Sequence, residues 1–413
     1  MSYKEAFFPT VFFWCIFIFF VGYYFFLHGL AGLTFPIPWP DEGSFLWQAI
    51  AVKDNNTLFS PQLNPDRDVM WMPPGYMLLH GVVFKFLGFS LELARLLSSV
   101  YLVFSMFLLA KIAKTREGYL LSVLLLGVTL VGNQFVFAGN FARMEGLVVL
   151  GLAFGLFLLH RGLVLKSVFV ASIIPLVHPN GFYFCLGFYV YALILLLKGR
   201  LNRPSFSDWL MFILVVLLWL FYVVYVFDNW SNFVGDMGFQ FKFKSDLSLF
   251  NGGFWGRFFS VESLLLLFLS VFCLFFGRSD FSRVILVAVF PLLLLNVSSL
   301  GMMYGVYKSL LCLLIIMVLA DISIVSGGKL FLDGLRRFFF LLANVLFFVG
   351  ATFFVNYTSL SWADFGKRSI FGMRAEVADY YTKEESEAVA LFLDDLHVDE
   401  GPVKVRFYPA ADA

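Results

Sequence analysis

Charged residues are scarce in this chain of 413 residues, and neither sign dominates. Only 14% of the residues are Asp, Glu, Lys or Arg, whereas soluble domains carry about 25%. The 29 Lys and Arg against 28 Asp and Glu leave a net charge of +1. There is therefore no basic excess to neutralise nucleic-acid phosphates, and no acidic excess typical of a solvated disordered chain. This balance excludes a nucleic-acid-binding protein and a secreted soluble domain.

Cysteine is also scarce, and the cysteines do not cluster. The chain has four, each inside a long apolar run: Cys15, Cys185, Cys273 and Cys312. A disulfide framework or a zinc site would instead group its cysteines in polar segments. We interpret these thiols as core or lipid-facing side chains, which excludes a disulfide-stapled fold and a cysteine-based metal site.

Long apolar runs are what the sequence has in abundance. The first, Phe7 to Leu30, is too long for the core of a signal peptide and is followed by no convincing cleavage site, so we expect it to remain as a transmembrane helix. Ten more apolar segments follow: Leu91–Ala110, Tyr119–Phe137, Leu147–Leu159, Leu163–Val177, Phe182–Leu197, Trp209–Phe227, Phe258–Phe276, Val284–Val297, Tyr304–Val325 and Phe338–Val355. The sequence predicts an all-α polytopic membrane protein with about eleven transmembrane helices.

One short apolar segment, Pro73 to Leu87, decides the predicted topology. If it crossed the membrane, Lys111, Lys114 and Arg116 would fall outside, against the positive-inside rule. We therefore interpret it as an amphipathic helix lying along the membrane interface. This choice predicts that the N-terminus faces the cytoplasm and the C-terminus faces the outside.

The predicted outer side receives most of the unusual polar residues. It contains the first outer loop (31–90) with its interfacial helices, the turns 138–145, 178–181 and 298–303, and the loop 228–256. Residues 1–356 form the predicted transmembrane domain, and residues 357–413 form a small soluble α/β segment on the outside. In that segment Lys383–Leu396 has a helical pattern and Val403–Tyr408 alternates like a strand.

Two adjacent carboxylates follow the first predicted helix. The rigid, proline-rich segment Pro36–Gly43 holds Asp41 and Glu42 at the membrane surface, a placement that suits a general base. Alternatively, Asp41 caps a helix running from Glu42 to Val52, and Glu42 complements its dipole. Further along the same loop, Asp66 and Asp68 could join these two around a hard cation, but no spacing demands a metal. No cofactor is predicted, and a divalent metal is not favoured.

The order of motifs resembles that of a known family. Asp41-Glu42, the helix beginning Pro73-Pro74-Gly75-Tyr76, the turn Phe86-Leu87-Gly88 and the helix start Leu93-Ala94-Arg95-Leu96 are similar to the GT-C glycosyltransferase superfamily. The likeness is to its protein mannosyltransferase and aminoarabinose transferase branch and covers roughly Phe7 to Gly181. It implies an inverting transfer from a polyprenyl-phosphate sugar, with Asp41 as the catalytic base and Glu42 as its companion. This chain has Met72 where several relatives have a basic residue.

Cations near the predicted outer rim are candidates to hold the donor phosphate, because charge-assisted contacts stabilise a phosphate leaving group. The candidates are Arg143, Lys308 and His178, with Arg95 and Arg257 considered beside them. Further substrate-binding candidates are Asp66, Asp68, Glu145, Tyr76 and Tyr304.

Several of these residues have simpler explanations. Arg95 follows Glu92 by three residues, so we expect the two to pair on the helix surface. Arg143 and Glu145 are two residues apart and cannot face each other on one helix, so each needs another partner. A tight turn accounts for the residues after His178, Lys308 could reach the outer headgroups, and Arg257 is an interface anchor.

The sequence thus predicts a GT-C type glycosyltransferase of the bacterial inner membrane with its active site facing the periplasm. Its expected partners are a polyprenyl-phosphate-linked sugar donor, membrane lipids and an acceptor that is a glycan, a lipid or a protein. Nucleic acid is not a partner. The alternative is a transporter or flippase that binds a lipid-linked substrate without chemistry. Transporters place substrate charges near the bilayer midplane, often between inverted repeats, and this chain has neither feature.

Overall fold

The computed structural model describes residues 40–114 and 138–245, Val287, and the helical residues 11, 14, 15, 17–19, 21, 22, 24 and 25. All regular elements in these residues are helices, and no strand occurs among them. This confirms the predicted helical class. The predicted span 119–137, the spans after residue 257 and the tail 357–413 with its α/β segment lie outside the described residues, so the count of about eleven spans stays a prediction.

The helices follow the predicted segments closely, with two exceptions. They are α2 (Pro40–Asn55), α3 (Gly75–Leu87), α4 (Leu91–Lys114), α7 (Glu145–His160), α8 (Val164–Ile173), the 3-10 helix η1 (Ile174–Leu176), α9 (Gly181–Leu197), α10 (Phe206–Asp228) and α11 (Trp230–Ser245). The predicted segment Leu163–Val177 is divided between α8 and η1. The first half of the predicted outer loop 228–256 contains α11, which follows α10 almost directly and which the sequence did not predict.

The helices α2 and α3 form a closely packed pair. Phe45, Leu46, Ala49 and Val52 recur at helical spacing on α2 and are buried. A Cβ added at Gly81 of α3 would lie 2.5 Å from the Val52 side chain, so only glycine lets the two backbones approach this closely. This pair contains most of the described part of the first outer loop.

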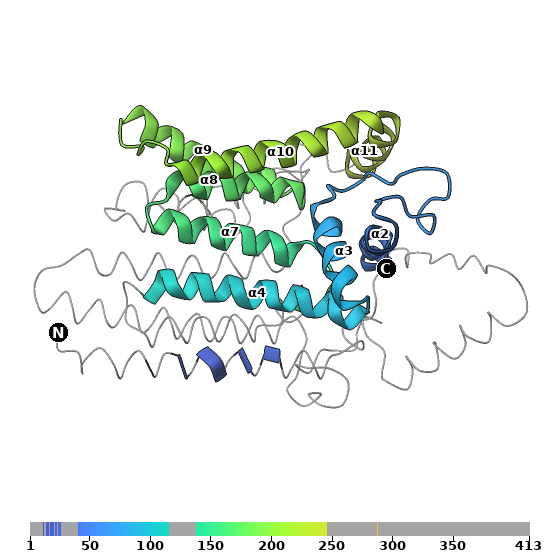
Figure 1. Cartoon of the computed structure of the whole chain (residues 1–413), viewed down its shortest axis with the longest axis horizontal. Coiled ribbons are helices and arrows are strands. Elements are labelled where there is room, and N and C mark those ends of the chain that lie inside the picture. The colour runs from blue at the N-terminus through green and yellow to red at the C-terminus, as the bar shows by residue number, and fades with distance from the viewer. Residues whose placement is uncertain are drawn as a thin grey trace, which may run out of the picture.

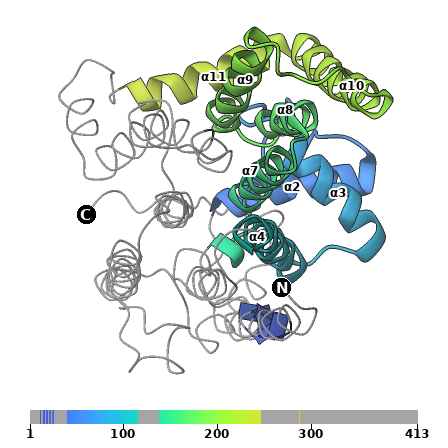
Figure 2. The same ribbon diagram turned by 90° about the vertical axis from the view of Figure 1, so that its left-hand side faces the viewer.

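The longer helices lie side by side in a row. Figure 2 shows α7 between α4 and α8, while α9 and α10 pack on α8. The helices α4 and α7 both begin near the α2–α3 pair, and Figure 1 shows the α9–α10 turn (198–205) at the opposite end of the row. The predicted inner cations Lys111, Arg161 and Arg200 therefore lie at one end of the row, and those candidate site residues that the structure describes lie toward the other.

Two of the described helices, Leu91–Ile112 within α4 and α10, are long and apolar enough to cross a membrane. At the start of α10 the Ser205 Oγ accepts from the Asp208 amide and the Asp208 carboxylate accepts from the Ser205 amide, which satisfies two amide groups that a helix start leaves unpaired. At the ends of α7 and α9, Gly162 (φ 76°) and Gly199 (φ 63°) adopt the left-handed conformation that terminates helices.

Candidate active site

A buried ion pair joins three segments that are far apart in the sequence. Arg95 of α4 donates from Nε to Glu42 Oε1 at 3.1 Å and from Nη2 to Glu42 Oε2 at 2.8 Å. The Ala142 amide, in the segment before α7, donates to Glu42 Oε1 at 2.7 Å. The side chains of Arg95 and Glu42 are 0% and 2% exposed. We call Glu42, Arg95 and Ala142 the polar junction.

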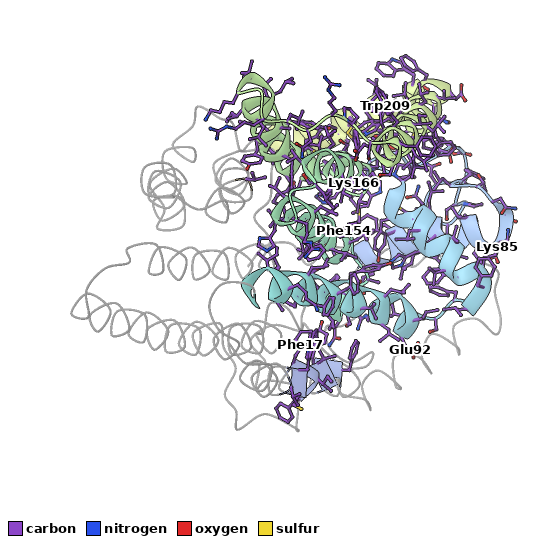
Figure 3. The ribbon with its side chains drawn as sticks, turned by 60° about the vertical axis from the view of Figure 1, so that its left-hand side comes forward. Phe17, Lys85, Glu92, Phe154, Lys166 and Trp209 are labelled. Carbon is purple, nitrogen blue, oxygen red and sulfur yellow. The ribbon has the colours of Figure 1, made fainter. Side chains whose placement is uncertain are left out.

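The polar junction corrects the expected pairing of Arg95. Glu92 lies exposed on α4 (Figure 3). Arg95 is buried and pairs with Glu42 instead. The physical reason is that the start of α2 lies within reach of this face of α4, so the buried guanidinium meets a carboxylate from another helix. A buried pair with two parallel hydrogen bonds holds its partners far more firmly than an exposed pair three residues apart.

Asp41 precedes Glu42 in the first turn of α2. Because α2 begins at Pro40, the backbone of Asp41 is already helical, and Asp41 is not the residue preceding the helix, as a capping role would require. The neighbouring Glu42 is fixed by Arg95 and by Ala142, so the backbone at residue 41 is held at the junction of α2, α4 and the segment before α7.

The expectation that Arg143 and Glu145 need separate partners was wrong. Arg143 Nη2 lies 3.1 Å from Glu145 Oε1. Arg143 belongs to the turn before α7, where its amide donates to Phe141 O at 2.8 Å, so the rule for two residues on one helix does not apply. The Arg143 guanidinium also lies 5.6 Å from the centre of the Phe141 ring and is 19% exposed.

Aromatic and hydroxyl side chains fill the space between α3 and α4. Tyr76 and His80, one turn apart on α3, are both fully buried, with ring centres 4.0 Å apart. His80 Nε2 lies 3.3 Å from the Tyr101 hydroxyl of α4. Burial lowers the pKa of His80 to about 3, which keeps its ring neutral at physiological pH. Tyr76 thus lies in the interior beside the polar junction.

The loop between α2 and α3 is tied to α11 by a second ion pair. Arg67 donates from Nη1 and Nη2 to the two carboxylate oxygens of Asp236 at 3.0 and 2.6 Å, and the Met70 amide donates to the same carboxylate at 2.7 Å. Burial alone would raise the pKa of Asp236, but these hydrogen bonds and the Arg67 charge hold that pKa below its ordinary value. We call Arg67, Met70 and Asp236 the loop clamp.

The remaining acidic candidates of this loop differ in exposure. Asp66 is exposed, and its amide donates to Asn64 Oδ1 in a turn. Asp68 is half-buried, its Oδ1 has no hydrogen-bond partner among the described residues, and burial raises its pKa. The structure therefore does not bring Asp66 and Asp68 into the polar junction by any contact within the described residues. No group of three potential metal ligands occurs there either.

His178 lies in the turn before α9 and is 4% exposed. Its Nδ1 accepts from the Asn180 amide at 3.0 Å, so the ring stabilises the turn that the sequence indicates here. The end of η1, just before this turn, lies close to α3, because a Cβ on Gly75 would be 2.5 Å from Leu176 O. The candidates Lys308 and Tyr304, like Arg257, lie outside the described residues.

Sequence reasoning missed several polar residues of this region. On α4, Ser98, Ser99 and Ser105 follow Arg95 by three, four and ten residues, which places all four on one side of the helix, and all four are fully buried. A polar stripe along one face of an otherwise apolar helix marks a face that packs against protein rather than lipid, and this spacing was visible in the sequence. The loop clamp left no comparable signal, because Arg67 and Asp236 are separated by 169 residues.

We compared the chain with known protein families, curated proteins and solved structures, and nothing in any of the three matches it.

Proposed function

We propose that the protein is a membrane glycosyltransferase that moves a sugar from a polyprenyl-phosphate donor to an acceptor at the outer face of the membrane. The observation that carries the proposal is the polar junction. It joins the segment after the first predicted helix, the start of α4 and the turn before α7 through Glu42, Arg95 and Ala142. Two of these segments carry motifs that resemble those of GT-C enzymes.

The ends of the helices suit a lipid-linked substrate. Such a donor keeps its tail in the bilayer, its phosphate at the interface and its sugar in water, so carboxylates and cations must lie at one membrane depth. The polar junction, the Arg143–Glu145 pair and the loop clamp all lie at the α2–α3 end of the row, while Lys111 and Arg200 lie at the far end. We place the first of these ends at the periplasmic face of the bacterial inner membrane.

In the proposed reaction, Asp41 deprotonates the acceptor hydroxyl or amine as it attacks the anomeric carbon from the face opposite the phosphate. The bond between that carbon and the phosphate oxygen breaks, the configuration inverts, and polyprenyl phosphate leaves. Glu42 has a supporting role, since its carboxylate already accepts three hydrogen bonds and serves to fix the start of α2. Asp66, Asp68 and Tyr76 remain proposed substrate contacts.

Arg143 is the described cation best suited to the donor phosphate. Its guanidinium is partly exposed and paired with Glu145, whereas Arg95 is buried and neutralised by Glu42. An Arg that is already oriented by a carboxylate and an aromatic ring can bind a phosphate with little loss of side-chain entropy. We propose that Lys308 and His178 complete this phosphate site.

The experiment that tests the proposal uses the purified full chain in liposomes with a radiolabelled polyprenyl-phosphate sugar. We expect time-dependent release of free polyprenyl phosphate, faster in the presence of a membrane extract that supplies acceptors. Exchange of intact labelled donor across the bilayer without release of polyprenyl phosphate would overturn the enzyme and favour the flippase. Empty liposomes and heat-treated protein serve as controls for spontaneous hydrolysis.

A further inference from the structure

The turn before α7, which carries Arg143, is held by hydrogen bonds to two other helices. The Ser99 hydroxyl of α4 donates to Gly139 O at 2.8 Å, and the Ala142 amide donates to Glu42 Oε1 of α2 at 2.7 Å. Both bonds are buried, so water does not compete for either of them. The backbone that leads into Arg143 is therefore fixed at two points.

Tyr24 of the first predicted helix takes part in the contact at Gly139. Tyr24 is 1% exposed, and its hydroxyl is hydrogen-bonded to the Ser99 side chain. Ser99 has a single hydroxyl proton, which it donates to Gly139 O, so Tyr24 is the donor and Ser99 Oγ the acceptor in the second bond. We call Tyr24, Ser99 and Gly139 the turn anchor. It joins three segments that are far apart in the sequence.

The turn anchor needs glycine at residue 139. A Cβ added to Gly139 would overlap the Tyr24 hydroxyl and would lie 2.9 Å from Ser99 Oγ. Any larger residue would therefore displace the Tyr24 ring, the Ser99 side chain or the turn itself. The absence of a side chain is what lets the first helix and α4 approach the turn this closely.

The bond made by Ser99 differs from the usual bond of a buried serine in a helix. A helical serine commonly donates to a carbonyl four residues earlier in its own helix, as Ser105 does to Tyr101 O at 2.6 Å. Ser99 instead donates to a carbonyl 40 residues away. This bond therefore contributes to the position of the turn and not to the helix that carries the serine.

We propose that the turn anchor positions Arg143 for the phosphate of the donor, with Tyr24 and Ser99 as positioning residues. This inference rests on the proposed function, in which Arg143 binds that phosphate. The guanidinium presents its N–H groups in a fixed plane, so a shift of the backbone that carries it misdirects its contacts to phosphate oxygens. The anchor also makes the first helix necessary for a complete phosphate site, because Tyr24 comes from that helix.

Hydrogen exchange of the full chain in liposomes tests the anchor without any reaction. Ser99→Ala removes the bond to Gly139 O, so the amides of residues 140–144 should exchange about fivefold faster. Ser105→Ala is the matched control, since Ser105 is equally buried on α4 but bonds within its own helix. Unchanged exchange in Ser99→Ala, or equal acceleration in Ser105→Ala, would overturn the proposal.

A double-mutant cycle tests whether Ser99 acts through Arg143. The probe is radiolabelled polyprenyl phosphate bound to the purified full chain. Ser99→Ala should weaken binding about five- to tenfold alone, but less than about twofold when Arg143→Ala is already present. Equal losses in both backgrounds would assign Ser99 a merely structural role and overturn the proposal. Absence of binding by the wild type would instead overturn the proposed function, and the exchange measurement would still decide the anchor.

Gly139→Ala tests the close approach of the first helix. This variant should weaken binding of the same probe at least about tenfold, because Tyr24 and the turn can no longer both keep their positions. Gly155→Ala is the matched control, since its Cβ would lie 2.8 Å from Phe188 Cζ in the middle of α7, away from the turn. It should bind the probe within about twofold of the wild type. Equal weakening by the two folded variants would overturn the proposal.

Discussion

The helices α4 and α10 have similar lengths and are both apolar enough to cross a membrane, yet they lie in opposite environments. In α4, 61% of the most apolar stretch is buried inside the protein, whereas in α10 only 11% is buried. The buried face of α4 contains Arg95 and three serines. The surface of α10 presents exposed Trp209, Leu217 and Phe221, with Trp209 visible at the periphery in Figure 3.

This difference shows that overall hydropathy does not distinguish a helix that is mostly buried within the protein from one that is mostly exposed. The helices α4 and α10 differ in where a few polar side chains lie along them. In α4 these side chains are all buried: Arg95 donates to Glu42 of α2, and the Ser99 hydroxyl donates to Gly139 O in the segment before α7. The middle of α10 has few side chains that can form hydrogen bonds. One of them is Trp219, which donates from Nε1 to Ser172 O of α8 at 2.9 Å.

The largest expected effect comes from removing the cation of the polar junction. Arg95→Ala leaves the Glu42 carboxylate buried without its charged partner, so the free energy of unfolding should fall by about 3–5 kcal/mol. Chemical denaturation in detergent, followed by tryptophan fluorescence, measures this change. Leu217→Ala on α10 is the matched control and should cost less than about 0.5 kcal/mol. A loss below about 1 kcal/mol for Arg95→Ala would contradict the importance of the junction.

The exposed face of α10 should be intolerant of charge at its centre. Leu217 is 57% exposed near the midpoint of α10, and a lysine at the bilayer centre costs about 2.5–3.5 kcal/mol of insertion free energy. Leu217→Lys should therefore lower the fraction of α10 that inserts in a microsomal translocation assay. Phe206→Lys, at the helix end where lysine reaches the headgroups, should have little effect. Equal insertion of both variants would argue against a lipid-facing α10.

The smallest effect is expected at the loop clamp, which ties α11 to the loop that precedes α3. The pKa of Asp236 is lowered in the folded state, so the clamp stabilises the fold above the ordinary Asp pKa of about 4 and loses that contribution as the pH falls. Arg67 is 36% exposed, so solvent weakens the pair and Asp236→Asn should lower the unfolding midpoint by only about 1–2 °C at pH 7.

The decisive measurement is how the difference in unfolding midpoint between the wild type and Asp236→Asn depends on pH. The gap between wild type and Asp236→Asn should narrow as the pH falls through 4 and below, because the wild-type carboxyl becomes protonated. Glu92→Gln, an exposed acid on α4, should show no comparable gap at either pH. A gap that widened on acidification would contradict the sign of the pKa shift.

The sequence alone was enough to predict helices wherever hydrophobic residues dominate a long segment. The periodicity and the flanking turns located α3, α7, α9 and α10 to within a few residues, because apolar runs bounded by Gly, Pro or charges leave few alternatives. It did not reveal α11, whose apolar residues alternate with Gly235, Gly238 and polar side chains. A helix of that composition depends on its contacts, here the loop clamp, rather than on its pattern.

The candidate site was predicted less completely than the helices. The sequence selected Glu42, Arg143 and Glu145 as candidates, but it did not predict the pairs Glu42–Arg95 and Arg143–Glu145, because pairing depends on which segments meet in space. Rules for neighbours on one helix made Glu92 the expected partner of Arg95, whereas in the structure Arg95 pairs with Glu42 of α2. Long-range contacts of this kind, such as Ala142 with Glu42, have no local signature.

The central claim is that the polar junction holds the start of α2 so that Asp41 acts as the catalytic base. The most direct test compares turnover of a polyprenyl-phosphate sugar by Asp41→Asn and by Glu92→Gln, an exposed acid outside the junction. Asp41→Asn should lose at least about a hundredfold in kcat with an unchanged unfolding midpoint, since general-base assistance contributes about 10²–10⁴-fold. Glu92→Gln should stay near the wild-type rate, and near-normal transfer by folded Asp41→Asn would contradict the claim.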